Sequence, residues 1–569
     1  MSYIIGIDLG TSTTEAAIYR NGKPELILNF LQQPVTPSAV GIDENGNWIV
    51  GERARAQYLL YPEKTAIEVK RGIGTDHMFP IGKQRFTAVE LSSRILEHVY
   101  TYASDFLGEP VDRAVISVPA YFNDIQRRET VMAGHAAGFQ VERIINEPTA
   151  AALSYGLLHM DEESHILVYD LGGGTFDITL LEMFDGVLEV KASSGDNKLG
   201  GKDFDECLIN HFCEEFRKQH RIDPASDAHA MVRLKSEAES CKKALSESDS
   251  YRVILPALMK KNNDPIGLDI TVTRDRFEEM TSHLLERTHH PIDTVLSDAG
   301  LSPFEIDKVI LVGGSTRMPM VVKDLEAYLN IPVSTAVNPD FAVAEGAAIQ
   351  AAIIAGDISP DEGLIMTDVN PYTLGVRVFD GMTSDKMSVI IPRNVTIPVV
   401  REQIYSTSFD YQTVAKIEVF QGESERVSSN HFLGDFSISG IPPKKAAKEQ
   451  ICVNFSYDLN GILSVTATIV STGGQASIEI DMTDSDETDI PEIDVESWKE
   501  APGASKYRSI IRKAERMLKK IDSDSDTVGY KTLSDGLLVL KKAIILENDS
   551  IADKCEETLT AAIRLLEKS

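Results

Sequence analysis

Apolar and polar positions in the first part of the chain repeat one plan of short runs and turns. Apolar runs at residues 3–7 and 165–169 each lead into an aspartate and a glycine. A second run in each case leads to a turn, at Asn21-Gly22 and at Asp185-Gly186. β-Branched and apolar residues between glycine-rich turns predict β-meanders. Because the plan occurs twice, the sequence predicts two similarly folded lobes.

Longer stretches between these runs have helical spacing. Residues 88–107 and 204–220 carry apolar side chains three to four positions apart, which predicts helices and, with the strands, an α/β architecture. The longest apolar stretch, residues 342–355, contains Glu345 and Gln350 and is too short to span a membrane. We expect it to form a buried helix.

The pattern changes after residue 356. A segment rich in turn-forming residues precedes a short apolar island, and we interpret 359–369 as a linker that follows a domain over 1–358. Residues 370–482 contain short strands separated by turns, with a hairpin signal at Asn460-Gly461, and predict an all-β domain. An acidic hinge over 483–502 and helical spacing over 503–569 complete the predicted organisation.

Composition and charge narrow the class of protein. The 569 residues, 43% hydrophobic and 25% charged, are those of an ordinary folded chain, long enough for about four compact units. A net charge of -31 repels polyanions, so we expect neither nucleic acid nor a membrane as a partner. Five cysteines without a CxxC pair and the absence of a secretory leader favour reduced thiols and a cytoplasmic location.

The two glycine turns carry the candidate chemistry. Asp8-Leu-Gly-Thr11 and Asp170-Leu-Gly-Gly-Gly-Thr175 each follow a predicted strand. Glycines let backbone N–H groups approach phosphate oxygens, threonine hydroxyls add hydrogen bonds, and carboxylates hold hydrated Mg²⁺. A single copy is more often a plain tight hairpin. Two copies at equivalent points of a duplicated fold favour a Mg-nucleotide site between the lobes.

A third glycine turn follows the apolar run 309–312. Gly313-Gly314 would let an adenosine lie close to the backbone, with the guanidinium of Arg317 stacked on the purine. A plain strand-to-helix turn has the same pattern. Taken alone, this motif favours the plain turn.

These three motifs, with segments 114–124, 143–152, 199–205 and 460–465, resemble the DnaK-type heat-shock chaperones. That family is the seventy-kilodalton class within the actin, hexokinase and sugar-kinase superfamily, and the resemblance extends over nearly the whole chain. It implies an actin-like two-lobed ATPase domain, a β-sandwich peptide-binding domain and a short C-terminal helical lid. The implied function is that of an ATP-dependent chaperone that binds extended hydrophobic segments of client proteins.

The resemblance also implies roles for single residues. Lys70 would orient the attacking water, Glu147 would contact a metal-bound water, and Asp8 and Asp170 would lie near Mg²⁺. Asp170, Thr175 and Asp177 would lie near the phosphates and a monovalent cation, expected to be K⁺. The further residues implied to contact the nucleotide are Gly10, Thr11, Ser12, Thr13, Gly172, Gly173, Gly174, Gly200, Gly201, Glu239, Lys242, Lys243, Ser246, Gly313, Gly314, Ser315, Arg317 and Asp340.

Peptide binding and coupling are implied in the same way. Phe379 and Ser408 match residues that arch over a bound peptide, although an ordinary β-core would also place apolar residues in this region. Pro119 and Arg127 match an interdomain switch, and Arg143 matches a position that contacts J-domain co-chaperones; an exchange factor stays open. The residues implied to line the peptide pocket are Val376, Val378, Tyr405, Ala415 and Ile417, and those implied to dock the linker are Leu364, Ile365 and Met366.

The sequence departs from the principal chaperones at several points. The segment between Lys70 and Pro119 is shorter, Thr367 interrupts the linker, Lys202 replaces a glutamate, and the acidic tail is missing. These traits resemble the specialised bacterial HscC branch. Two alternatives are a small-molecule kinase of the same superfamily and a peptide-binding module whose ATPase has decayed.

Overall fold

The computed structural model describes residues 3–479, apart from 158, 160–162, 185, 334–337, 359–364 and 380–384, together with 504–518 and positions 537, 540, 541, 559, 560 and 563. The chain forms two compact units, Met1–Ile480 and Asp481–Ser569. The predicted acidic hinge and most of the predicted helical lid lie outside the described residues. In the second unit, helix α10 covers Ala504–Leu518.

The first lobe is built on a sheet centred on β1 (Ile4–Leu9). β1 pairs in parallel with β10 (Arg113–Val118) and antiparallel with β2 (Thr13–Arg20). Its apolar side chains are buried, in keeping with the short apolar runs of the sequence. The other strands of this sheet are β3 (Lys23–Leu26), β4 (Val35–Pro37) and β11 (Gln140–Asn146), in the order β11-β10-β1-β2-β3 with β4 beside β2.

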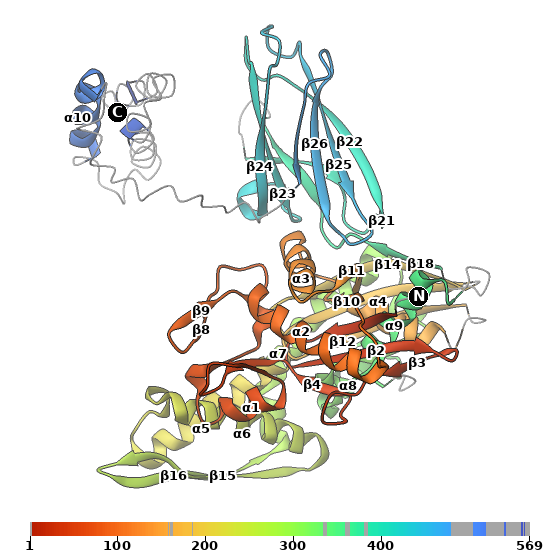
Figure 1. Ribbon diagram of the computed structural model, residues 1–569, viewed down its shortest axis with the longest axis vertical. Helices are drawn as coiled ribbons and strands as arrows, with labels where there is room; N and C mark the ends of the chain where they lie inside the picture. Colours follow the sequence, from red (N-terminus) through yellow and green to blue (C-terminus); the bar gives the residue numbers. More distant parts are fainter. Residues whose placement is uncertain are drawn as a thin grey trace. The chain divides into compact units, whose positions relative to one another are not determined.

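The second lobe repeats this arrangement (Figure 1). β12 (Ser164–Leu171) pairs in parallel with β17 (Lys308–Val312) and antiparallel with β13 (Phe176–Phe184), which pairs with β14 (Val187–Asp196). Each lobe therefore has a central strand with one parallel and one antiparallel neighbour. The duplicated meander predicted from the sequence is confirmed.

Two helices, α4 (Glu147–Gly156) and α9 (Ala342–Ala355), pack against each other, and α9 also packs on β1. A Cβ on Gly346 would lie 1.7 Å from the carbonyl oxygen of Ala150, so only glycine allows this approach. α9 is buried over most of its length, which confirms the prediction for 342–355. None of the described helices is long and apolar enough to cross a membrane.

The outer elements of the first lobe begin and end at recognisable signals. Helix α2 (Ala88–Leu107) starts at a capping box between Thr87 and Glu90 and ends at Gly108, which has a left-handed conformation. The other outer elements are β5 (Ala39–Ile42), β6 (Trp48–Val50), α1 (Glu52–Tyr58), β7 (Thr65–Ile67), β8 (Phe79–Ile81), β9 (Gln84–Phe86) and α3 (Asp124–Ala136).

The second lobe carries a larger helical part. Helices α5 (Gly201–His220) and α6 (Ala228–Glu247) contact each other, and their apolar faces join the sheet in one buried cluster. The remaining elements are β15 (Ser250–Lys261), β16 (Asp264–Thr273), α7 (Arg274–Ala299) and α8 (Pro319–Leu329). Helices α5 and α6 therefore pack next to the glycine turn between β12 and β13.

Residues from about 370 onward form a β-sandwich, as predicted. One sheet has the order β20-β19-β23-β24 and the other β22-β25-β26-β27 (Figure 1). Alternate side chains of β25 and β26 are buried, so the two sheets enclose an apolar core. The strands are β19 (Leu374–Val378), β20 (Lys386–Ile391), β22 (Val399–Ser406), β23 (Val414–Gln421), β24 (His431–Ser439), β25 (Gln450–Tyr457), β26 (Leu463–Ile469) and β27 (Gln475–Glu479).

A single strand, β18 (Ile365–Val369), pairs in both domains. It extends the sheet of the second lobe in parallel with β14, with Met366 opposite Leu188. It also pairs antiparallel with β21 (Thr396–Ile397) of the sandwich. The first part of the predicted linker, including Leu364, lies outside the described residues, and its second part is this strand.

The sandwich also contacts the first lobe through the turn between β25 and β26. The Ile144 N–H donates to Asn460 Oδ1 over 3.0 Å, and the Leu463 N–H donates to Asp124 Oδ1 over 2.7 Å. The guanidinium of Arg128 donates to the Leu463 carbonyl oxygen. The hairpin predicted at Asn460-Gly461 is thus part of the contact between the two domains.

Candidate functional site

The two glycine turns face each other between the lobes. A Cβ on Gly173 would lie 2.6 Å from Ser12 Oγ, and one on Gly174 would lie 3.1 Å from Thr11 Oγ1. Gly10 is equally restricted, because a Cβ there would lie 2.4 Å from the carbonyl oxygen of Thr13. The two turns therefore lie against each other, and the binding of a phosphate chain between them stays a prediction.

Four carboxyl groups and one ammonium group are buried behind these turns. The Lys70 ammonium donates to Glu147 Oε1 over 2.5 Å, and each side chain is at least nine-tenths buried. Asp8 lies at the end of β1 and accepts from Ser117 Oγ over 2.8 Å. Asp170 and Asp177 stand opposite each other on β12 and β13. The equivalent strand ends of the two lobes thus bring their acidic side chains together.

Burial and mutual repulsion raise the pKa values of these carboxyl groups. Burial, followed by the charge of Glu147, raises the pKa of Asp8 to about 6 and that of Asp177 to about 7. The pKa of Asp170 lies well above its usual value because of burial and of the charges of Glu147 and Asp177. The positive charge of Lys70 acts in the opposite direction and lowers the pKa of all three aspartates. A bound cation would further relieve this repulsion.

The cluster fits a hydrated magnesium ion. Asp177 Oδ2 is buried and has no hydrogen-bond partner among the described residues. Within the described part of the chain, no three His, Cys, Asp or Glu side chains stand together as direct metal ligands. Because Mg²⁺ usually keeps several of its waters, Asp8, Glu147 and Asp170 suit a site that holds the ion through its water shell.

The residues predicted to surround the adenosine come together on the second lobe. Gly201 begins α5, and its N–H donates to the carbonyl oxygen of Gly172 over 2.9 Å. Ser315 Oγ donates to the same oxygen over 2.8 Å. Gly313 has φ 82°, and a Cβ there would lie 2.5 Å from the Leu171 carbonyl oxygen. The third glycine turn therefore lies directly beside the glycine turn that follows β12.

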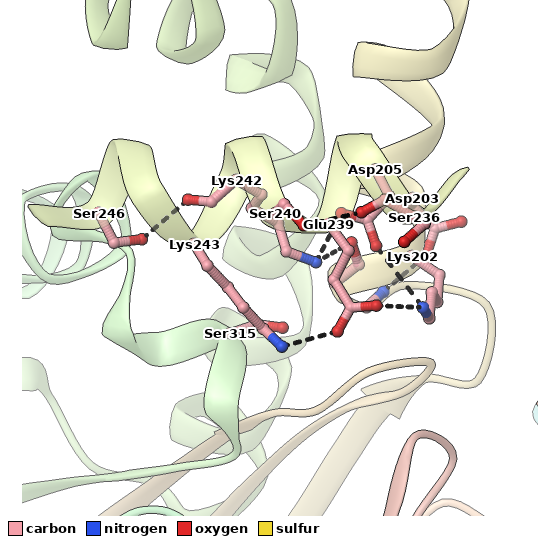
Figure 2. A network of polar contacts seen from close by, with 12 residues as sticks. Lys202, Asp203, Asp205, Ser236, Glu239, Ser240, Lys242, Lys243, Ser246 and Ser315 are labelled. Carbon is pink, nitrogen blue, oxygen red and sulfur yellow. Dashed lines mark hydrogen bonds and ion pairs between the residues drawn. The ribbon is translucent and has the colours of Figure 1, made fainter. Parts of the chain in front are cut away.

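Helix α6 contributes a network of charged side chains to the same region (Figure 2). The Lys242 ammonium lies 2.8 Å from Asp205 Oδ1 and donates to the Gly201 carbonyl oxygen. Lys243 pairs with Glu239 over 2.7 Å, and Ser246 Oγ donates to the Lys242 carbonyl oxygen. The helix thereby presents its polar face to the start of α5.

Arg317 does not lie free beside the third turn. Its Nη2 lies 2.6 Å from Asp340 Oδ2, and its Nε lies 3.3 Å from Asp340 Oδ1. A two-point pair of this kind fixes the plane of the guanidinium. The stacking of Arg317 on a purine stays a prediction, and Asp340 is the residue that would orient the stacking plane.

A cavity of about 210 Å³ continues from the phosphate turns outward between the lobes. Ion pairs that join the two lobes line it: Arg55 with Glu239 over 2.8 Å, and Arg71 with Asp203 over 2.9 Å. Burial works to raise the pKa of Glu239, but Lys202, Lys243 and Arg55 lower it well below its usual range. Charge pairs therefore connect the two lobes at this cavity.

The predicted switch residues lie between the nucleotide site and the sandwich. Pro119 follows β10, and its carbonyl oxygen accepts from the Phe122 N–H. Arg127 is 3% exposed and donates to Ala120, Phe122 and Asn146 oxygens. Asn146 in turn donates to Asp368 Oδ2 of β18 over 2.7 Å. A hydrogen-bonded path thus leads from the Pro119 loop to the linker strand.

Arg143 on β11 also faces the linker strand. Burial lowers the pKa of its guanidinium, and the nearby carboxylate of Asp368 works against that shift. The Arg143 Nε–H is buried and donates to no partner among the described residues. Its predicted contact with a J-domain therefore involves a side chain that is partly enclosed in this arrangement of the chain.

Four of the predicted peptide-pocket residues lie on β19 and β23 of one sheet of the sandwich, and Tyr405 lies on β22 of the other sheet. Val376 belongs to the buried core, whereas the other four are partly buried and pack against it: Val378, Tyr405, Ala415 and Ile417. The Tyr405 hydroxyl bonds to Ser388 Oγ over 2.9 Å. Phe379, half exposed, lies with its ring 6.3 Å from that of Phe409, which is 65% exposed. Ser408 instead binds Gln412 through its N–H.

A protein-family model described as Hsp70 protein matches residues 4–81 and 77–568. The chain belongs to the Hsp70 family. Hsp70 proteins are ATP-dependent chaperones that use ATP and ADP with Mg²⁺, bind client peptides and work with J-domain co-chaperones. Membership fits the two-lobed α/β domain and the β-rich domain that follows it.

Sequence reasoning missed several residues of this Hsp70 site. Ser117 and Tyr121 donate to Asp8 and Asp177, and Asp205 pairs with Lys242. All three lie inside the segments that carried the family resemblance, but nothing local marks a backbone N–H or a serine as a carboxylate partner. Phe409 was signalled only by being an aromatic residue in an otherwise polar turn.

Proposed function

We propose that this Hsp70 protein binds extended hydrophobic segments of client proteins in its sandwich and that ATP binding and hydrolysis control its affinity for them. The observation that carries the proposal is β18, which pairs with β14 of the second lobe and with β21 of the sandwich. A strand shared in this way makes the state of one domain depend on the other. Reciprocal linkage then couples nucleotide and peptide binding.

The buried cluster supports hydrolysis by positioning and charge neutralisation. Magnesium bound with ATP neutralises charge on the phosphates when it is present. Lys70 is fixed by Glu147 behind the two phosphate turns, where its ammonium can orient a water molecule at the terminal phosphate. The glycine N–H groups and the hydroxyls of Thr11, Thr13 and Thr175 supply contacts to the phosphate oxygens. K⁺ beside Asp170 and Asp177 belongs to the same proposal.

The sandwich wall supports the choice of ligand. The partly buried Val378 and Ile417 offer an apolar surface beside the core residue Val376, and Ala415 leaves room for an incoming side chain. Burial of one leucine-like side chain there would contribute about 1.5–3 kcal/mol. Phe379 and Phe409, both exposed, can cover a peptide that lies across this wall. The ligand class is therefore an extended segment with a central apolar residue.

The sequence departures support a place in the bacterial HscC branch, and the cytoplasmic location expected from the sequence belongs to the same proposal. Among them, Lys202 lies 3.7 Å from each of Glu68, Asp205 and Glu239, so a glutamate at this position would lie close to three like charges. A J-domain co-chaperone that contacts Arg143 completes the proposal. Its binding would be linked to the docking of β18 because Asp368 lies near Arg143.

The two other functions considered from the sequence have less support. A small-molecule kinase needs no β-sandwich joined through the sheet of its second lobe. A decayed ATPase would be expected to have lost some of the buried groups, yet Asp8, Lys70, Glu147 and Asp170 are all in place. The ATP-dependent chaperone therefore fits the whole molecule better than either.

The test measures peptide release and hydrolysis on the full chain. A fluorescent peptide with a central leucine is bound, and its dissociation rate is followed with ADP and with ATP. A matched peptide with serine in place of leucine is the control. We expect faster release with ATP than with ADP and weak binding of the serine peptide. Equal rates in both nucleotides would refute ATP control, and equal binding of the two peptides would refute the ligand class.

A further inference from the structure

The backbone of Tyr121 connects three parts of the molecule. Its N–H donates to Asp177 Oδ1 over 2.9 Å. Its carbonyl oxygen accepts two hydrogen bonds of 2.8 Å, one from Asn197 Nδ2 of the second lobe and one from the hydroxyl of Tyr372. Tyr372 lies in the sandwich domain, three residues after β18. A side chain of the sandwich therefore hydrogen-bonds to the same residue, Tyr121, whose N–H donates to the buried Asp177 carboxylate.

Tyr372 is held firmly by its own domain. Its carbonyl oxygen accepts from Asn370 Nδ2 over 2.7 Å, and Asn370 is completely buried. The same Nδ2 donates to the Pro392 carbonyl oxygen, and Asn370 Oδ1 accepts from the Val395 N–H. The ring of Tyr372 packs on that of Tyr121 with centroids 4.3 Å apart. The position of the hydroxyl is thus set by the base of the sandwich.

The backbone of Tyr121 has little freedom to move while Asn197 and Tyr372 donate to its carbonyl oxygen. A Cβ on Gly195 would lie 3.3 Å from both Tyr121 Cβ and Asp177 Oδ1, so the backbone of β14 packs closely against both residues. Asp177 Oδ1 is held by the Tyr121 N–H, while Oδ2 has no hydrogen-bond partner among the described residues. The orientation of the Asp177 carboxylate therefore depends on the position of the Tyr121 backbone.

We propose that Tyr372 is a positioning residue for ATP hydrolysis, whose hydroxyl sets the orientation of Asp177 through the backbone of Tyr121 while the sandwich is docked. This proposal rests on the proposed ATPase and peptide-binding function. When a client displaces the sandwich, the hydroxyl leaves and only Asn197 holds the Tyr121 carbonyl oxygen. The nucleotide site then senses the docking of the sandwich through one hydrogen bond.

Two other sets of contacts between the sandwich and the lobes do not involve the carboxylate cluster. Arg393 pairs with Asp298 at the end of α7 over 2.7 Å, and Asn394 donates to the other oxygen of that carboxylate. Leu463 is held by Asp124 and Arg128. These contacts can keep the sandwich docked when the Tyr372 hydroxyl is removed. Docking and the proposed signal can therefore be separated by mutation.

The experiment compares the parent with Tyr372→Phe, which keeps the ring and removes the hydroxyl. Single-turnover ATP hydrolysis is measured with and without a saturating hydrophobic peptide, and ATP affinity is measured with a fluorescent analogue. Amide hydrogen exchange of 365–369 reports docking of β18 independently of activity. Tyr328→Phe is the matched control, because its hydroxyl donates to Asp293 on the surface of the second lobe.

We expect Tyr372→Phe to keep parental ATP affinity and β18 protection but to change unstimulated hydrolysis by about threefold to tenfold, the effect of one neutral hydrogen bond. Its rate should approach that of the peptide-bound parent, so that peptide no longer changes it. Asn197→Ala, which removes the donor inside the lobe, should change hydrolysis both with and without peptide. Tyr328→Phe should behave as the parent.

Three results would overturn the inference. They are an unchanged peptide response in Tyr372→Phe, a loss of β18 protection that shows the hydroxyl to act only in docking, or an equal effect of Tyr328→Phe. A parent that neither hydrolyses ATP nor responds to peptide would instead overturn the proposed function. The two failures are therefore distinguishable in the same data set.

Discussion

Replacement of Asp177 by asparagine should stabilise the nucleotide-free protein while weakening Mg-ATP binding. Asp177 is 0% exposed, and burial together with Glu147 raises its pKa from 3.8 to about 7. At about 1.4 kcal/mol per pKa unit, keeping the ionised carboxylate buried costs ~4 kcal/mol at a pH above 7. Asparagine has the same shape and can still accept from the Tyr121 N–H, but it carries no charge.

The stability gain should depend on pH in one direction. The folded chain keeps the proton of Asp177 up to about pH 7, whereas the unfolded chain releases it near the ordinary value of 3.8. Unfolding therefore releases a proton between these values, and the free energy of unfolding of the parent falls as the pH rises through this window. The difference between variant and parent should be complete at about pH 8 and absent at about pH 4.

Urea unfolding of the full chain in EDTA, without nucleotide, measures this difference at both pH values. Asp269→Asn is the control, because the exposed Asp269 pairs with Arg252 on the surface and its replacement should change the free energy of unfolding little. A fluorescent nucleotide titration should show weaker Mg-ATP binding by Asp177→Asn, since a charge that faces the cation is lost. The prediction would be refuted if variant and parent had equal free energies of unfolding at both pH values, or if the variant bound Mg-ATP more tightly. It requires that burial and the charge of Glu147 destabilise the ionised Asp177 carboxylate and that a bound cation relieves this.

Three further outcomes are expected. Lys70→Ala should lower single-turnover hydrolysis by at least about 100-fold with Mg-ATP affinity nearly unchanged, because the ammonium acts on the water rather than on the adenosine; near-normal turnover would remove Lys70 from the mechanism. Ala415→Phe should fill the peptide pocket and weaken peptide binding in fluorescence anisotropy without a change in basal turnover, and unchanged affinity would mean that the pocket lies elsewhere. Replacement of Leu364, Ile365 and Met366 by aspartate should remove the difference between peptide release rates in ATP and ADP, because Met366 packs on a buried cluster to which both lobes contribute; a retained difference would place the coupling in other contacts.

Much of the fold could be predicted from local patterns. The meander around Asp8 and its copy around Asp170 follow from short β-branched runs and glycine turns, which act over a few residues. The helix at 342–355 follows from its apolar composition, and the sandwich follows from strands separated by turns such as Asn460-Gly461. The roles of Lys70 and Glu147 came from resemblance alone, because neither residue stands in a pattern that identifies its chemistry.

The sequence by itself determined the repeated turns, the order of the domains and the side chains available for phosphate and magnesium. Only the tertiary structure decided which groups meet. Tyr121 and Asp177 are 56 positions apart, and Tyr372 lies 251 positions after Tyr121. The strength of a hydrogen bond or an ion pair depends on distance in space and on burial, which no local pattern encodes. The raised pKa of Asp177 and the partners of Lys202 therefore emerged only when the lobes were brought together.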